Sequence, residues 1–279
     1  MKATIVSYSL SEMPRDIATW KTQLVAELES LLSSESELIL YPELFLAGLG
    51  IYLPDLKDIA KYLEETLFPE IQKLMKGKEK LLVLGSGPRR NGKFLKNSSP
   101  IFMDDNLFFQ DKLFLTPWET EFVPGDELVL FSFKSLKTAV VICFDSEQPD
   151  LSMKLKEAQL DLMLIPSATT NRNGSQRVNR CASARAVELG AVVLTSPLVG
   201  SCSFDLVDHN EGRQGIFYPA QDVVDFDQEK FSNYSTRERI ETTFTIDHSL
   251  LKKLKERTSE TKPYHKEFHP SLKIMTRNA

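Results

Sequence analysis

The amino-acid sequence predicts one α/β domain whose strands form a mixed sheet or two packed sheets. Short runs rich in β-branched and aromatic residues alternate with amphipathic segments as far as about residue 218. No linker rich in Pro, Gly and Ser interrupts this alternation. The strand candidates at 80–85, 100–103 and 107–110 follow one another without a helix, whereas parallel neighbours need a crossover between them. A wholly parallel sheet is therefore excluded.

The strands are predicted from ten apolar runs of four to six residues, most of which are bounded by polar or turn-forming residues. One of these runs stops at Pro42, because proline cannot donate a sheet hydrogen bond and holds the preceding residue extended. The predicted strands are 4–8, 37–41, 80–85, 100–103, 107–110, 128–133, 138–143, 160–165, 191–196 and 215–218.

The helices are predicted from amphipathic segments at 13–32, 56–75, 149–159 and 175–189. Pro149 is a favoured first residue of a helix, and Gly190 is suited to the left-handed cap that ends one. After residue 250 the chain turns basic, and we expect a short helix over 250–257 and then an extended arm. The buried stripe of the first helix is predicted to consist of residues at helical spacing: Trp20, Leu24, Leu28, Leu31 and Leu32.

Composition and charge exclude several classes of protein. With 42% hydrophobic and 26% charged residues, the 279-residue chain resembles ordinary globular proteins and not disordered ones. A net charge of −5 argues against a nucleic-acid binder, which needs a basic face. The most apolar stretch, 44–53, is too short to span a bilayer, and the N-terminal residues do not resemble a signal peptide. Three cysteines provide no disulfide framework, so we expect a cytoplasmic protein.

The charge is unevenly distributed along the chain. Residues 251–279 contain eight Lys/Arg and three Asp/Glu, a net charge of +5, so the first 250 residues carry −10. We therefore expect a main domain at 1–250 and a basic C-terminal arm at 251–279 that packs on the domain or across a dimer.

Common catalytic signatures are absent from the sequence. It contains no GxSxG elbow, no phosphate-binding GxxxxGK[ST] loop and no HExxH helix. The Gly85-Ser86-Gly87 segment lacks the third glycine of a dinucleotide fingerprint and predicts a turn after a strand. All four histidines lie in the last third of the chain, which weakens any pairing of Ser or Cys with His, and His265 and His269 lack a third metal ligand. A hydrolase would therefore need another base.

Cys143 is the first candidate nucleophile. It closes a predicted apolar strand and precedes a predicted helix, whose N-terminal partial charge would lower the pKa of a nearby thiol. A cysteine at the end of an apolar strand is, taken alone, more often a small buried hydrophobic residue. The other two cysteines, Cys181 and Cys202, are expected to pack in the fold.

Two charged residues lie in comparable apolar settings. Glu43 stands between an apolar strand and an apolar loop, where partial desolvation would raise its pKa towards that of a general base; the alternative is a solvated glutamate at a strand end. Lys112 lies between two apolar runs, either snorkelling at a strand edge or held as a buried cation by carboxylates. Glu119, seven residues later and next to Trp118, is a possible partner.

Several motifs together resemble the nitrilase superfamily of carbon–nitrogen hydrolases over roughly residues 3 to 220. They comprise Pro-Glu at 42–43, Lys-x-x-Leu-x-Pro at 112–117, Ile-Cys-Phe-Asp at 142–145, Asp-Leu-Met-Leu-Ile-Pro-Ser-Ala at 161–168 and Arg-Ala-Val-Glu at 185–188. The resemblance implies a four-layer α-β-β-α sandwich with two mixed sheets, a homodimer or higher homo-oligomer, and no metal or organic cofactor.

The same resemblance implies roles for individual residues. Cys143 would be the nucleophile, Glu43 the general base and Lys112 the stabiliser of the tetrahedral intermediate. Glu119 matches the second glutamate of many members, and Glu121 competes for that position because the following segment is slightly compressed. The substrate and oxyanion contacts are expected from the loops that follow the strands: Phe144, Glu147, Ser167 and Ala168.

Differences from the family pattern bear on the substrate. Asp145 resembles the amidase branches, whereas nitrilases more often have Cys-Trp-Glu here, so a small amide or N-carbamoyl compound and water are the expected reactants. Glu147 stands where many amidase branches have arginine. An acyltransferase or a nitrilase with the same three residues, and a non-catalytic scaffold, are the alternatives. Neither nucleic acid nor membrane is expected as a partner.

Overall fold

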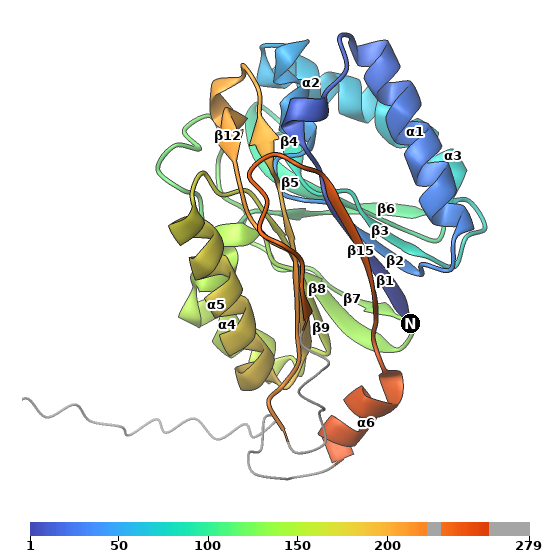
Figure 1. Cartoon of the computed structure of the whole chain (residues 1–279), viewed down its shortest axis with the longest axis vertical. Coiled ribbons are helices and arrows are strands. Elements are labelled where there is room, and N and C mark those ends of the chain that lie inside the picture. Colours follow the sequence, from blue (N-terminus) through green and yellow to red (C-terminus); the bar gives the residue numbers. More distant parts are fainter. Residues whose placement is uncertain (222–229, 257–279) are drawn as a thin grey trace, which may run out of the picture.

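In the computed structural model, which describes residues 1–221 and 230–256, the chain folds into two mixed sheets packed face to face, each covered by helices on its outer side (Figure 1). The first sheet has the order β15 (Ile240–Thr245), β1 (Lys2–Ser7), β2 (Leu38–Leu40), β3 (Leu81–Val83), β5 (Phe94–Met103) and β4 (Gly87–Asn91), and β6 (Asn106–Asp111) also pairs with β5. The second has the order β14 (Lys230–Phe231), β13 (Gly215–Phe217), β10 (Val192–Pro197), β9 (Leu162–Ser167), β8 (Leu136–Val140) and β7 (Leu130–Phe133).

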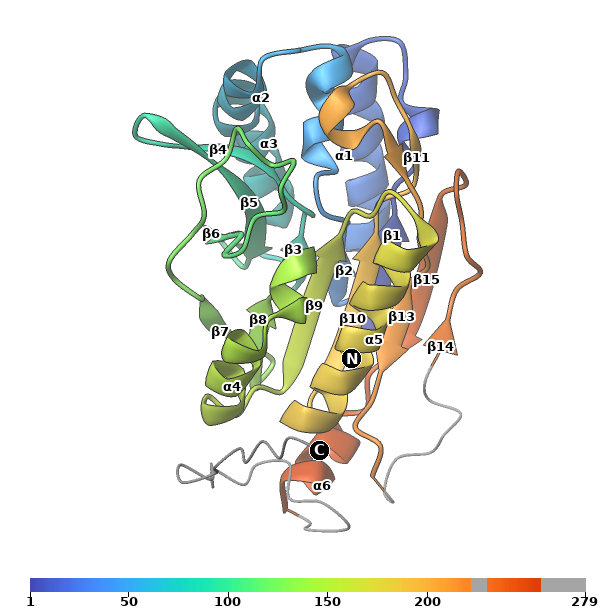
Figure 2. The same cartoon turned by 90° about the vertical axis from the view of Figure 1, so that its left-hand side faces the viewer.

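Three helices cover the first sheet and two cover the second. The first group is α1 (Ile17–Ser33), α2 (Leu56–Tyr62) and α3 (Phe68–Met75), and the second is α4 (Pro149–Glu157) and α5 (Arg172–Leu189) (Figures 1 and 2). This is the four-layer sandwich that the sequence motifs implied. A two-stranded ribbon of β11 (Gly200–Ser201) and β12 (His209–Asn210) and a last helix, α6 (His248–Glu256), complete the described elements.

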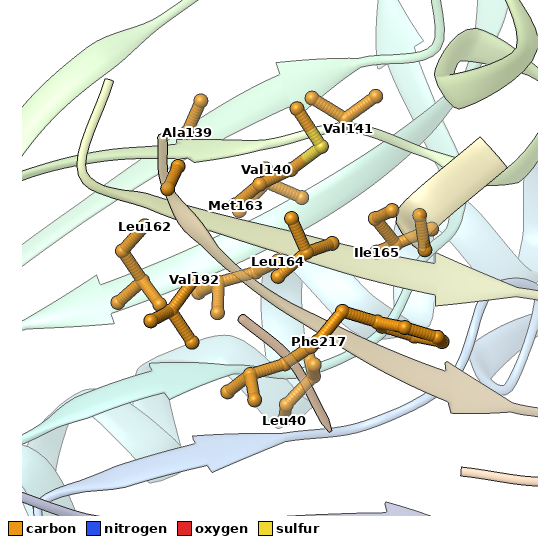
Figure 3. Close-up of a cluster of buried hydrophobic side chains, with 14 of the residues drawn as sticks. Leu40, Ala139, Val140, Val141, Leu162, Met163, Leu164, Ile165, Val192 and Phe217 are labelled. Carbon is orange, nitrogen blue, oxygen red and sulfur yellow. The ribbon is translucent and has the colours of Figure 1, made fainter. Parts of the chain in front are cut away.

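Alternation along the strands explains the layering. In β2, Leu38 and Leu40 belong to the core between the sheets, and Ile39 belongs to the core under α1–α3. Since successive side chains of a strand point to opposite faces, an all-apolar strand must be covered on both sides. Residues of β8, β9, β10 and β13 contribute to the same inter-sheet core as Leu40 (Figure 3).

The parallel strands place their carboxyl ends at the candidate site. In the first sheet β1, β2 and β3 are parallel, and in the second β8, β9 and β10 are parallel. Antiparallel β5–β6 and β7–β8 pairs flank them, which confirms that the sheets are mixed. The predicted buried stripe of α1 is also confirmed, and Gly190 ends α5 with φ +63°, in the left-handed region.

Some boundaries differ from the sequence prediction. The segment 56–75 is not one helix, because a π-helical turn over Leu63–Leu67 separates α2 from α3. The predicted strand 138–143 ends at Val140, and Cys143 begins a 3₁₀ turn over Cys143–Glu147. Three edge strands, β4, β14 and β15, were not predicted, because β14 has only two residues and most side chains of β4 and β15 are polar. Residues 257–279, most of the predicted basic arm, lie outside the described residues.

Candidate active site

Glu43 reaches the site because the chain turns sharply after β2. Leu44 has φ +54°, and its N–H donates to Ser86 Oγ at 2.9 Å. Gly85 has φ +61°, and a Cβ atom there would lie 2.0 Å from the carbonyl oxygen of Pro42. Only glycine lets these two backbones approach so closely. The turn aims Glu43 into the protein, with 1% of the residue exposed.

Lys112 lies directly after β6 and joins two carboxylates. Its Nζ donates to Glu43 Oε1 at 2.7 Å and to Glu119 Oε2 at 2.6 Å. Thr116 holds Glu119 in place, donating to Oε2 from its backbone N–H at 2.9 Å and from its hydroxyl at 2.7 Å. Of the two glutamates considered from the sequence, Glu119 is the one that contacts Lys112, whereas Glu121 lines an open cleft.

Cys143 enters from the second sheet. Its φ of +45° is unusual for a residue with a side chain, and such backbone strain concentrates at functional sites. The thiol Sγ donates to the Ala168 carbonyl at 3.8 Å, and the Ala168 N–H donates to Glu43 Oε2 at 2.9 Å. The backbone of Ala168, just after β9, therefore contacts both side chains.

Burial and charge set the pKa values of this group, in which Glu43 is 1%, Lys112 2%, Glu119 2% and Cys143 5% exposed. Burial raises the pKa of Glu43 above its ordinary value, although Lys112 opposes this. Burial would lower the pKa of Lys112, but the negative charges around it outweigh that effect and raise it. Burial, together with the charge of Glu43, raises the pKa of the Cys143 thiol. At rest, the group therefore holds a protonated thiol beside a lysine ammonium.

Asn97 is a site residue that the sequence reasoning missed. Its Nδ2 donates to Glu119 Oε1 at 2.9 Å and to Glu43 Oε1 at 3.3 Å, and its Oδ1 accepts from Ser86 Oγ at 2.6 Å. The signal was present in the sequence, since a run of four polar residues, 96–99, interrupts the apolar residues of the segment that forms β5. Buried polar residues in a central strand need partners and often indicate a site.

Asp145 was noted in the sequence only as a sign of the amidase branches. In the structure its buried carboxylate accepts from the N–H groups of Leu113, at 3.1 and 3.2 Å, and of Phe114, at 2.7 Å. These bonds connect the turn that carries Cys143 to the segment that carries Lys112. Burial raises the pKa of Asp145 to about 7, against the opposing effect of the two N–H donors.

The other residues predicted to contact the substrate or the oxyanion differ in whether a protein group already binds them. The Phe144 N–H, which follows Cys143 in the chain, has no acceptor within the described residues. The Ser167 hydroxyl donates to the carbonyl of Ser196 at 3.4 Å, on the neighbouring strand. Glu147 Oε2 accepts from Arg177 Nε at 3.2 Å. Ser167 and Glu147 thus have protein partners of their own.

A cleft of about 1090 Å³ opens next to the buried group. Its lining includes Trp118 and Thr120, which flank Glu119 in the chain, and Thr170, two residues after Ala168. Trp118 is 58% exposed. The four buried side chains do not themselves line the cleft.

Neither a metal centre nor a membrane-spanning helix is present in residues 1–221 and 230–256. No group of three or more His, Cys, Asp or Glu side chains there is arranged to hold a metal ion. None of the helices in this part of the chain combines the length and apolar character needed to cross a bilayer.

Comparison with curated proteins finds two hydrolases, whereas no protein-family model matches the chain. A probable hydrolase, YhcX, of Bacillus subtilis is 26% identical over 201 residues, which cover 67% of this chain and 38% of that protein. An (R)-stereoselective amidase of a Pseudomonas species is 24% identical over 144 residues, covering 51% of this chain and 52% of that protein. The matched regions thus span about half or less of these relatives.

Solved structures share the fold over most of the chain. Saccharomyces cerevisiae Nit3, a member of branch 10 of the nitrilase superfamily, matches with a TM-score of 0.69 and 19% identity, covering 92% of this chain and 93% of Nit3. A mutant of the amidase from Nesterenkonia sp. AN1, with acrylamide added at the active-site cysteine, matches with a TM-score of 0.69 and 15% identity, covering 90% and 95%. The fold is that of the nitrilase superfamily, as the sequence motifs predicted.

Proposed function

We propose that this chain is a carbon–nitrogen hydrolase that cleaves a small linear amide or N-carbamoyl compound through a thioester on Cys143. The observation that carries this proposal is the buried Lys112 ammonium held by Glu43 and Glu119 beside a thiol. Burying an ion pair costs free energy, and apolar residues of similar volume would stabilise a purely structural core at least as well. Amidases among the relatives and fold neighbours support the same chemistry.

In the proposed first half-reaction, Glu43 removes the thiol proton while Cys143 Sγ attacks the amide carbon. A base is needed because the pKa of the thiol is raised, and the raised pKa of Glu43 makes it a stronger one. The negative charge that develops on the amide oxygen is stabilised by the Lys112 ammonium and by the Phe144 N–H. Glu43 then gives its proton to the leaving nitrogen, and ammonia or an amine departs.

In the second half-reaction, Glu43 removes a proton from water, and the resulting hydroxide attacks the thioester carbonyl. The C–S bond breaks, the carboxylic acid leaves, and the thiolate regains a proton from Glu43. One carboxylate thus acts as base and acid in both halves, which explains how the site can work without histidine. Glu119 and Asn97 hold Lys112 and Glu43 in position throughout.

The proposal is tested by measuring ammonia release from a panel of small amides and N-carbamoyl compounds. Wild-type chain should release ammonia from at least one of them, and Cys143→Ala should release none. Cys181→Ala and Cys202→Ala are matched controls, since each removes a thiol outside the site, and both should keep their activity. Unchanged release by Cys143→Ala would contradict the mechanism. An acyl adduct on Cys143, followed by intact mass, that is cleared faster by an added amine than by water would indicate an acyltransferase instead.

We also propose that the enzyme is a cytoplasmic homodimer or higher homo-oligomer to whose assembly the basic arm contributes. Light scattering of the full chain should then give at least twice the mass of one chain. A chain that ends at Glu256 retains α6 but lacks most of the basic arm. It should unfold more easily than the full chain or form a smaller oligomer. If truncation changed neither stability nor mass, the role of the arm would be wrong.

A further inference from the structure

A second cavity, of about 590 Å³, is lined by residues of α5, β13 and β14. Figure 2 shows these elements next to one another on the second sheet. It shares no lining residue with the cleft that Trp118 and Thr120 line. Its volume is within the range of roughly 300–1,000 Å³ that is usual for small-molecule sites. Nothing in the proposed reaction uses this cavity.

The lining of this cavity is strongly basic. Arg172 and Arg180 reach it from α5, and Arg213 reaches it from the segment just before β13. No acidic side chain lines it, and within the described residues none of these three guanidinium groups forms an ion pair. The acidic group that contacts the lining is Glu211, which accepts a hydrogen bond from the Tyr234 hydroxyl at 2.8 Å.

Two of the three guanidinium groups are held in place by aromatic rings. The Arg213 guanidinium lies 4.3 Å from the centroid of the Phe231 ring, and that of Arg172 lies 5.1 Å from the centroid of the Tyr234 ring. Stacking on an aromatic face leaves the N–H groups at the edge of a guanidinium available for hydrogen bonds. Among residues 1–221 and 230–256, Arg180 is bound through Nη2 alone, to Gln176 Oε1 at 3.2 Å. The guanidinium N–H groups are therefore held in position, and most of them have no hydrogen-bond acceptor within the described residues.

The helical side of the cavity is polar over three turns of α5. The residues that line it recur at the spacing of one helix face, beginning at Arg172 and ending at Ser183. An amphipathic helix would normally present apolar side chains where it faces a sheet. On this stretch of α5 the face towards β13–β14 carries hydroxyl, amide and guanidinium groups instead: Arg172, Ser175, Gln176, Asn179, Arg180 and Ser183.

We propose that this cavity binds the phosphate group of a small phosphorylated molecule. Guanidinium groups bind phosphate through pairs of parallel N–H···O bonds, and a phosphate monoester offers three outer oxygens and a charge near −2 to three such groups. The hydroxyl and amide groups on α5 provide donors and acceptors for the rest of the ligand. The overall negative charge of the protein and the concave shape of the cavity favour a small ligand over a nucleic acid.

Isothermal titration calorimetry of the full chain with pyrophosphate, at constant ionic strength, tests the proposal. Saturable binding to one site per chain is expected. Arg180→Gln and Arg213→Gln should each weaken the affinity by about tenfold or more, because each removes charge-assisted hydrogen bonds to phosphate. Arg15→Gln is the matched control, since it makes the same change at an exposed arginine that does not line the cavity, and it should bind as the wild type does.

Two further measurements separate phosphate binding in this cavity from effects at the thiol and from loss of stability. Cys143→Ala should bind pyrophosphate with unchanged affinity, because the cavity is separate from the thiol; loss of binding there would overturn the assignment. Arg180 is exposed and, in the described part of the chain, bonded to Gln176 alone, so Arg180→Gln should keep the thermal midpoint of the free protein. The proposal is also overturned if wild-type protein shows no saturable heat, if Arg15→Gln weakens binding as much as Arg180→Gln, or if malonate binds more tightly than pyrophosphate.

Discussion

Replacing Lys112 with methionine should be strongly destabilising at neutral pH and should abolish hydrolysis. The substitution keeps most of the side-chain volume but removes the ammonium that lies 2.7 Å from Glu43 Oε1 and 2.6 Å from Glu119 Oε2. Both carboxylates would remain buried without a counter-ion. Removing one partner of a buried ion pair costs about 3–5 kcal/mol, so we expect a loss of unfolding free energy of about that size.

The loss should depend on pH in a defined direction. Without Lys112, burial would hold the folded-state pKa of Glu43 and Glu119 above their unfolded values. The folded variant would then bind more protons than the unfolded chain between those values, so its stability should rise as the pH falls from neutral towards about 5. In the wild-type protein, Lys112 favours the charged forms of Glu43 and Glu119. The stability of the wild type should therefore rise less than that of the variant over the same fall in pH.

Urea unfolding followed by tryptophan fluorescence measures both effects, with Trp20 as a buried reporter. Lys21→Met is the matched control, because Lys21 Nζ pairs with Glu70 at 2.8 Å on a partly exposed surface. Such a pair contributes below about 1 kcal/mol, so the control should be nearly as stable as wild type at every pH. If Lys112→Met were no less stable than Lys21→Met, or still hydrolysed amides, the Lys112 ammonium would not be needed to compensate the buried carboxylates or to catalyse the reaction.

Three further substitutions test the supports of the site. Asn97→Ala should lower kcat by about tenfold to a hundredfold with a smaller change in KM, because Glu43 and Glu119 each lose a donor, while Asn106→Ala on the surface should have no effect; an unchanged kcat would exclude a positioning role. Asp145 has a folded-state pKa of about 7, above its unfolded value, so its protonation stabilises the fold at acidic pH and this contribution falls as the pH rises from about 4 to 7. In urea unfolding, Asp145→Asn should therefore lack that fall, and identical pH profiles for variant and wild type would contradict the raised pKa. The third substitution is Gly85→Ala, and Gly92→Ala is its matched control. Gly92→Ala should lower the free energy of unfolding by about 1–2 kcal/mol, because alanine disfavours the positive φ at this open position. Gly85→Ala should cost about 1–3 kcal/mol more, because its Cβ would collide with Pro42, and equal thermal midpoints for the two variants would show that this contact is relaxed.

Much of the fold could be predicted because its strands are short apolar runs with clear ends. All ten predicted strands overlap strands of the structure, and the absence of helices among 80–110 correctly indicated mixed sheets. The edge strands β4 and β15 were missed because an edge strand with one solvated face lacks a continuous apolar signal. Burial of all of β2, by contrast, left a plain apolar run in the sequence.

The site was predicted where a residue follows a strand and missed where a partner comes from elsewhere in the chain. Glu43 and Cys143 stood out because a functional side chain followed or ended an apolar run, and Lys112 because it lay between two such runs. The structure brings Lys112 into contact with Glu43. Asn97 lies in a polar run in the middle of β5, which is a local signal of a site, but its contacts with two distant glutamates depend on tertiary packing. The positive φ of Cys143 was likewise hidden, because the apolar residues before it predicted a continuing strand.

The most direct test of the central claim is intact-mass measurement of the full chain, quenched in acid during turnover of an amide that it hydrolyses. A covalent thioester on Cys143 predicts a species heavier by the acyl group, present in the wild type, absent in Cys143→Ala and cleared by water once the amide is consumed. The modified peptide should contain Cys143 and neither Cys181 nor Cys202. Steady ammonia release with no acyl adduct, or an adduct that persists in Cys143→Ala, would contradict the account.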